Sequence, residues 1–263
     1  MKPKITIVTS SYWRPDLLRR AILSVQNQTL QDYEHIVVSD HDPFTEHVCN
    51  DFKDDDRIRF IEVQKPYEYN LGAVSFNIGL DNAKSDYFCY VLDDDILYEN
   101  HLKEHFLHFR KGNTIGHSGF KQIDFIEPNN TAKFIASTSL ETLQKMNHNS
   151  VDCKDVSRMS HTVEIGKNNK WKTQTECVNN WEDNEFMKAI GLGSEHSINE
   201  VTTIKCQWGG VSRSKETKGV DKEYYDALMS KVVKDDTTFS GYRLESDTPY
   251  VYPELKNSLF EES

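Results

Sequence analysis

The stretch Tyr87-Phe-Cys-Tyr-Val-Leu92, followed directly by Asp93-Asp94-Asp95, decides the fold. Its first six residues are aromatic, β-branched or apolar and carry no charge, which is typical of a short buried strand. A strand that ends in three aspartates brings like charges to the edge of a sheet, where they repel one another. A divalent cation such as Mg²⁺ or Mn²⁺ would offset this repulsion, because hard cations prefer carboxylate oxygens. The alternative interpretation is a solvated acidic turn.

The segments around this strand alternate between strand and helix patterns. Short apolar runs predict further strands over Lys4–Thr9, His35–Val38 and Arg57–Val63. Apolar residues at helical spacing predict helices that begin at Pro15, span Gly72–Ala83 and span about Glu99–Arg110. This alternation predicts an α/β fold with a mostly parallel, Rossmann-like central sheet flanked by helices. Side chains that follow the strands would then gather at one edge of the sheet, where ligands bind in such folds.

The chain beyond residue 113 is less regular. The patterns predict helices over Thr138–Met146, Trp181–Ile190 and Lys222–Val232, and a strand over Val201–Trp208. The polar loop Ser39-Asp40-His41-Asp42-Pro43 is expected in the first half, at the carboxyl end of a strand.

Composition and charge restrict the classes of function. At 263 residues the chain can bury the core of one large α/β domain or two small ones. No stretch approaches the ~18 apolar residues that a membrane span requires. The net charge of −11 argues against nonspecific binding to nucleic acid or anionic membrane, unless a local basic patch exists. Five cysteines without a CxxC spacing indicate free thiols in a cytoplasmic protein, rather than disulfides or a zinc site.

Four blocks in the first 110 residues resemble family 2 glycosyltransferases of the GT-A fold in order and approximate spacing. The blocks are Thr9–Thr29, Asp32–Asp40, Asn77–Ala83 and Tyr87–Leu102. In the second half, Trp181-Glu-Asp-Asn-Glu-Phe186 resembles the family's Glu-Asp motif on a helix. The chain departs from the family at Ser39, where an acid usually precedes Asp40. It departs again at Phe76, where the family often has an arginine.

The resemblance implies an inverting glycosyltransferase that depends on Mn²⁺ or Mg²⁺ and moves a sugar from a UDP-sugar to an acceptor hydroxyl. It implies that residues 1–112 bind the nucleotide sugar and that residues 113–263 form the acceptor-binding half with a C-terminal tail. Both halves are expected to form one compact GT-A domain.

The resemblance also assigns roles on the donor side. Tyr12 would stack on the nucleobase and Asp40 would accept a hydrogen bond from it, with Ser10 in contact beside them. The alternatives are a loop anchor for Tyr12 and a turn or helix cap for Asp40. Asn77 would brace the donor loop. Apart from the resemblance, the glycines in Trp208–Arg213 allow a hinged loop that would bring Arg213 over the diphosphate, and the alternative is a plain turn at the end of a strand.

Two assignments of the metal-facing carboxylates remain open. The alignment with the family places the metal-facing carboxylate at Asp94, with Asp93 beside the ribose or phosphate. A literal Asp-x-Asp pattern favours Asp93 and Asp95 instead.

The general base is expected at Asp183, ahead of Glu182, near the start of a predicted helix. The alternative is that both are ordinary residues of a helix start. The resemblance places the acceptor side loosely at Asp155, Ser157, Met159, His161 and Trp181. For His161 a structural role is favoured over a catalytic one.

Two further functions are consistent with the layout of the sheet. A sugar-1-phosphate nucleotidyltransferase usually carries a Gly-rich loop after the first strand, and this chain lacks one there. A nucleotide-sugar-binding module without catalysis is the non-enzymatic alternative. A glycan or lipid-linked glycan is the favoured acceptor, and a modified DNA base would need a basic groove such as Lys167–Lys172.

Overall fold

The computed structural model describes residues 2–12, 15–40, 43–63, 72–126, 131–137, 156–173, 176–177, 182–208, 232–234 and 242–244. Four strands of the first half form a parallel unit in the order β3-β2-β1-β4. Their bounds are β1 Ile5–Ser11, β2 Tyr33–Ser39, β3 Ile58–Glu62 and β4 Tyr87–Tyr90. Strands β1 and β2 are almost entirely buried, which explains their continuous apolar runs.

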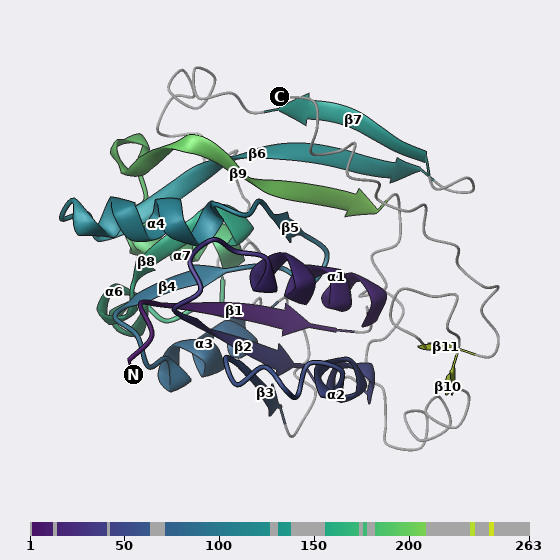
Figure 1. The fold of residues 1–263 in the computed structure, drawn as a ribbon. Coiled ribbons are helices and arrows are strands. Elements are labelled where there is room, and N and C mark those ends of the chain that lie inside the picture. The colour runs from purple at the N-terminus through teal and green to yellow at the C-terminus, as the bar shows by residue number, and fades with distance from the viewer. Residues whose placement is uncertain are drawn as a thin grey trace.

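The sheet continues from β4 with strands of mixed direction. Its full order is β3-β2-β1-β4-β8-β6-β9-β5, with β7 paired to β6. The bounds of the added strands are β5 Ile96–Leu97, β6 Ile115–Ile126, β7 Thr131–Ser137, β8 Met159–Thr162 and β9 Ser197–Trp208. Strand β8 lies antiparallel to both β4 and β6, whereas β6 and β9 are parallel. Strands from residues 1–112 and from residues 113–263 therefore share one sheet (Figure 1).

Helices cover both faces of the parallel unit. Residues of α1 (Pro15–Gln26), α2 (Pro43–Asn50) and α4 (His101–Arg110) pack on one face. Residues of α3 (Ala73–Asn82) and α7 (Glu182–Ala189) pack on the other. The remaining elements are α6 Val163–Asn168, the 3₁₀ turns Val156–Arg158 and Ser194–His196, and a separate pair of strands, β10 Val232–Lys234 and β11 Tyr242–Leu244.

One close approach between helix and sheet depends on a glycine. A Cβ atom on Gly79 of α3 would lie 2.6 Å from the Cγ2 of Val8 in β1 and 3.3 Å from the ring of Phe88 in β4. The absence of a side chain on Gly79 lets α3 pack closely against β1 and β4, the second of which leads to the acidic triplet.

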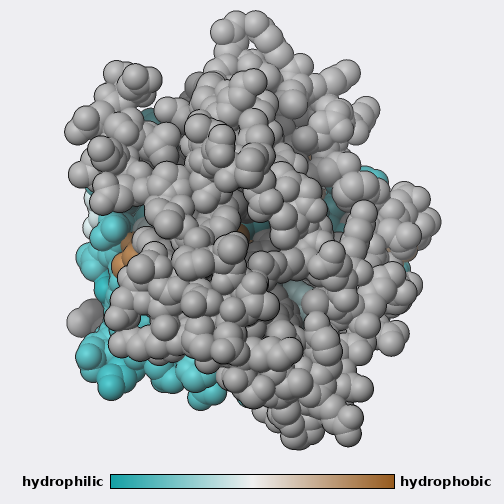
Figure 2. Space-filling view, turned by 90° about the vertical axis from the view of Figure 1, so that its right-hand side faces the viewer, coloured by the Kyte–Doolittle hydropathy of each residue, from teal (hydrophilic) through white to brown (hydrophobic). Residues whose placement is uncertain are grey.

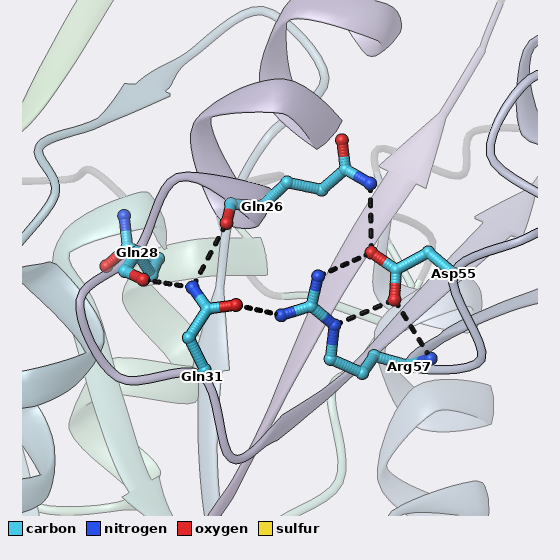
Figure 3. Close-up of polar contacts among 5 residues, drawn as sticks. All are labelled: Gln26, Gln28, Gln31, Asp55 and Arg57. Carbon is cyan, nitrogen blue, oxygen red and sulfur yellow. Dashed lines mark hydrogen bonds and ion pairs between the residues drawn. The ribbon is translucent and has the colours of Figure 1, made fainter.

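Arg57 joins the loop before β3 to the end of α1 (Figure 3). Its guanidinium donates to Asp55 Oδ1 at 2.7 Å and to Oδ2 at 2.6 Å, and it also reaches Gln31 Oε1. Gln26 of α1 donates to the same Asp55 carboxylate at 2.9 Å. The hydrogen bonds from Arg57 hold the pKa of Asp55 at about 2, below its ordinary value of 3.8.

The predicted α/β fold is confirmed, and the elements predicted in the first half are present with shifts of a few residues at their ends. Helix α2 was not predicted, because Pro43 was placed in a polar loop, whereas it begins this helix. The predicted helix over Thr138–Met146 lies outside the described residues. The predicted helix over Lys222–Val232 does too, except for Val232, which belongs to β10. None of the helices in the described part of the chain is long and apolar enough to cross a membrane.

Candidate functional site

The loops after β1, β2 and β4 meet at the carboxyl edge of the parallel strands. The backbone N–H of Tyr12 donates to Asp93 Oδ2 at 3.3 Å, and the N–H of Asp40 donates to the Ser11 carbonyl at 3.0 Å. Strands β1 and β2 point to the right in Figure 1, and Figure 2 views the molecule from that side, where the visible described surface is mostly hydrophilic. The predicted gathering of Tyr12, Asp40 and the acidic triplet at one edge is therefore present.

The three aspartates differ in their surroundings. Asp95 is 1% exposed and its Oδ2 accepts a hydrogen bond from Ser157 Oγ at 2.6 Å. Ser157 in turn accepts from the backbone N–H of Leu92 at 2.9 Å, so one hydroxyl joins the end of the strand to the last aspartate. Asp93 is 6% exposed, whereas Asp94 is half-buried and is the most open of the three.

Arg20 supports the turn that holds the triplet. This buried arginine lies on α1, and its Nη2 donates to the backbone carbonyl of Asp94 at 2.8 Å. It places a positive charge at the backbone of the turn that carries the three aspartates. Sequence reasoning missed Arg20. The available signal was an arginine on the face of α1 that also carries buried apolar residues.

A buried polar network lies under the edge, on the face covered by α3 and α7. The indole Nε1–H of Trp171 donates to the Tyr90 hydroxyl at 3.0 Å, and that hydroxyl lies 2.6 Å from His161 Nε2. His161 Nδ1 lies 2.8 Å from the Thr162 carbonyl, so Nδ1 carries the proton and Nε2 accepts from Tyr90. Burial lowers the pKa of His161 to about 4, which keeps its ring neutral.

Asn77 holds the backbone at Trp171. Its side-chain amide donates to the Trp171 carbonyl at 2.8 Å, and its Oδ1 accepts from the Trp171 N–H at 3.0 Å. Both polar groups of the side chain therefore bind this backbone, and the expectation that Asn77 braces a donor loop stays a prediction. Phe76, which stands where the family often has arginine, is buried and meets the ring of Tyr90 edge-on at 5.1 Å.

Helix α7 carries the proposed base and is docked on the same network. Phe186 stacks on Trp171 with ring centroids 4.1 Å apart and an interplanar angle of 10°. It also lies edge-on to Tyr90, in the strand that leads to the triplet. Glu182 is 2% exposed, whereas Asp183 is half-buried, so Asp183 is the more accessible of the two acids at this helix start.

Several expected acceptor-side residues lie elsewhere. Met159 and His161 are fully buried in the core, which agrees with the structural role favoured for His161 and leaves neither side chain open to an acceptor at the surface. Ser157 is also fully buried and holds Asp95 instead. Asp155, Trp181 and Arg213 lie outside the described residues. Ser10 is half-buried in β1.

The side chains of the triplet suit a hard divalent cation. Carboxylate oxygens are the ligands that Mg²⁺ and Mn²⁺ prefer. Asp94 combines a carboxylate with partial exposure, while Ser157 occupies one oxygen of Asp95. Of the three carboxylates, that of Asp94 is therefore the most accessible to a cation, and the choice between the two assignments stays a prediction.

The fold and this acidic edge define the chain as a member of glycosyl transferase family 2, whose model matches residues 6–183. The structure of S. aureus TarS 1-349 in complex with UDP-GlcNAc aligns with a TM-score of 0.61 at 11% identity, over 86% of this chain and 64% of that chain. The predicted GT-A fold is thereby confirmed.

Two curated relatives have similar sequences. The GalNAc(5)-diNAcBac-PP-undecaprenol beta-1,3-glucosyltransferase of Campylobacter jejuni is 36% identical over 102 residues, which cover 38% of this chain and 32% of that protein. An uncharacterized glycosyltransferase of Rickettsia felis is 25% identical over 265 residues, covering 95% of this chain and 41% of that protein. The chain thus spans well under half the length of these two relatives.

Proposed function

We propose that this chain transfers a sugar from a UDP-sugar to an acceptor hydroxyl with inversion at the anomeric carbon, assisted by Mn²⁺ or Mg²⁺. The observation that carries the proposal is the hydrogen bond from the Tyr12 N–H to Asp93 Oδ2, because it joins the loop expected to bind the base to the acidic turn expected to bind the diphosphate. The complex of TarS with UDP-GlcNAc supports this donor class.

The donor would lie across the ends of β1, β2 and β4. The ring of Tyr12 would stack on the base, and Asp40 would accept a hydrogen bond from it. Asp40 is 6% exposed and its backbone is tied to Ser11, so the two loops that hold the base are fixed to each other. Ser10 lies beside Tyr12 on the same strand end.

Asp94 would face the cation with Asp93 beside the ribose or phosphate, and Asp95 would orient the turn through its bond to Ser157. The bound cation would supply positive charge that stabilises the departing diphosphate. Arg20 contributes from behind the turn by holding the Asp94 carbonyl, which fixes the backbone between the two outer carboxylates.

Asp183 would take the proton from the acceptor hydroxyl as that oxygen attacks the anomeric carbon. Direct attack with loss of UDP inverts the configuration, and the proton ends on Asp183. The first turn of α7 favours an ionised carboxylate, which is the form a base needs. The stack of Phe186 on Trp171 fixes the helix that carries Asp183.

The first experiment measures thermal shifts with a panel of nucleoside diphosphates, with and without Mn²⁺. We expect UDP to stabilise the protein most, and Mn²⁺ to increase that shift. Asp94→Asn should lose the Mn²⁺-dependent part of the shift. Equal shifts with all nucleotides, or a Mn²⁺ effect unchanged in Asp94→Asn, would contradict the assignment of the donor site.

The second experiment measures UDP release from UDP-sugars with Asp183→Asn and with Glu185→Gln, a half-buried acid in the same first turn. We expect Asp183→Asn to lose about 10²–10⁴-fold in turnover while keeping its UDP-dependent thermal shift. Glu185→Gln should stay within a few-fold of the parent. Unchanged turnover in Asp183→Asn would refute the base. Binding without turnover in the parent would indicate a non-catalytic binding module instead.

The favoured acceptor is a saccharide. A modified DNA base as acceptor would need a basic groove such as Lys167–Lys172. In that stretch Lys170 Nζ donates hydrogen bonds to both carboxylate oxygens of Asp81, at 2.5 and 2.6 Å. This pairing reduces the positive charge that the groove would offer to phosphates.

A further inference from the structure

A second group of potential ligands is buried on the opposite face of the sheet from α7. Cys89 of β4 and His101 and His105 of α4 offer one sulfur and two ring nitrogens that all lie within 4.8 Å of one another. All three side chains are 0% exposed. The two histidine rings are 4.2 Å apart, centroid to centroid. Strand β4 leads directly to the acidic triplet, and α4 lies beyond it (Figure 1).

The hydroxyl groups around the first ring determine which of its nitrogens carries the proton. Thr202 Oγ1 donates its proton to Ser118 Oγ at 2.6 Å and lies 2.8 Å from His101 Nδ1. Since the hydroxyl proton of Thr202 is already used, His101 must donate from Nδ1. Its Nε2 then keeps a free lone pair.

The same reasoning applies to the second ring. Ser160 Oγ donates to the Gly116 carbonyl at 3.4 Å and lies 2.6 Å from His105 Nδ1. When the Ser160 hydroxyl donates to that carbonyl, His105 donates from Nδ1 as well. Among the described residues, no group forms a hydrogen bond with Nε2 of either His101 or His105. Two buried ring nitrogens without hydrogen-bond partners, on rings in contact with each other, are unusual, because buried polar atoms normally form hydrogen bonds.

The chemistry of these groups matches a metal ion. Histidine ligands characteristically donate their second ring N–H to an oxygen, which is the arrangement that Thr202 and Ser160 create. Sulfur and imidazole ligands together suit zinc.

We propose that Cys89, His101 and His105 bind a zinc ion. Zn–S and Zn–N bonds of about 2.3 and 2.0 Å at tetrahedral angles place ligand atoms about 3.3–3.5 Å apart, so the ligand atoms would close by about 1 Å at most around the ion. A water would complete the four ligands. Binding moves the thiol proton of Cys89 to solvent, so one proton leaves for each zinc ion bound.

The site would fix both ends of the segment that carries the acidic triplet. Cys89 lies in β4, which comes before the acidic triplet. His101 and His105 lie on α4, which follows β5. An ion bound by Cys89, His101 and His105 would restrain both ends of the loop that carries the triplet. It would not contact a sugar donor. The role is structural, and its test does not depend on the proposed transferase activity.

The test is the zinc content of the full chain after expression with added zinc, compared between Cys89→Ala and Cys49→Ala. Cys49 is also a buried free thiol, but it lies in the cluster between α1 and α2. We expect about one zinc ion per chain in the parent and in Cys49→Ala, and loss of that ion in Cys89→Ala. Substoichiometric zinc in the parent, or equal zinc in both variants, would overturn the proposal.

Two further measurements keep the proposal testable if one variant folds poorly. Cobalt substituted for zinc should give a thiolate-to-metal absorption band in the parent that Cys89→Ala lacks. Asp94→Asn should keep the band, which separates this site from the acidic edge. At a hundredfold excess of zinc over its Kd, the apo protein should gain about 5–10 °C in Tm. A parent without the band and without that gain would contradict the site.

Discussion

Replacement of Ser157 by alanine should destabilise the protein and loosen the acidic turn. The hydroxyl is fully buried, donates to Asp95 Oδ2 at 2.6 Å and accepts from the Leu92 N–H at 2.9 Å. A hydrogen bond to a charged group contributes about 1.5–3 kcal/mol, and a buried N–H left without its acceptor costs about 1–3 kcal/mol. Since the two terms share one atom and do not add fully, we expect a loss of about 3 kcal/mol.

The assay is urea unfolding, in which a loss of about 3 kcal/mol lowers the midpoint by about 1 M for a slope near 3 kcal/mol per M. Ser75→Ala is the matched control. Ser75 is 0% exposed in α3, and its hydroxyl has no hydrogen-bond partner among the described residues. We expect Ser75→Ala to change stability by less than about 0.5 kcal/mol, because alanine favours a helix. Equal losses in the two variants would refute the reasoning that the Ser157 hydroxyl anchors the turn.

Three further predictions concern the packing and charge of the parallel unit. The pKa of Asp55 lies at about 2 because Arg57 donates hydrogen bonds to its carboxylate. The pair should therefore stabilise the fold above about pH 4, and the free energy of unfolding should fall by about 1–2 kcal/mol as the pH falls toward 2. Urea unfolding of Asp55→Asn measured over the same pH range should not show this fall. Tyr90→Phe should lower the free energy of unfolding by about 2–4 kcal/mol, because the buried groups of His161 and Trp171 lose their hydrogen bonds. Tyr87→Phe, at a half-buried position, should lower it by less than about 1 kcal/mol. Similar losses in the two variants would contradict the buried network. Gly79→Ala should lower Tm, because its Cβ would lie 2.6 Å from a valine of β1, and an unchanged Tm would show that α3 can move away.

The parallel part of the fold could be predicted because its strands are short apolar runs separated by helical spacing. The carboxyl ends of such strands meet at one edge, so Tyr12, Asp40 and the acidic triplet were expected together, and the bond from Tyr12 to Asp93 places two of these loops in contact. What these residues bind stays a prediction.

The rest of the site depends on contacts between distant parts of the chain. Ser157 lies far from Asp95 in the sequence, and nothing local distinguishes it from an acceptor-side residue. His161 is polar by type, yet the hydroxyl of Tyr90 and a backbone carbonyl satisfy it inside the core. The histidines of α4 likewise form a buried face only because Ser160 and Thr202 arrive from β8 and β9. A periodicity argument treats these polar residues as exposed, since it cannot see their partners.

The pairing of β4 has a consequence for how the protein is made. One edge of β4 is covered by β1, which precedes it, whereas the other is covered by β8, where Tyr87 pairs with Thr162. As the chain leaves the ribosome, β4, which precedes the aspartates, therefore keeps one open edge until the β8 segment emerges. Open strand edges recruit other chains. A nascent chain truncated before residue 159 should aggregate or require a chaperone, while one extended past residue 162 can cover this edge of β4.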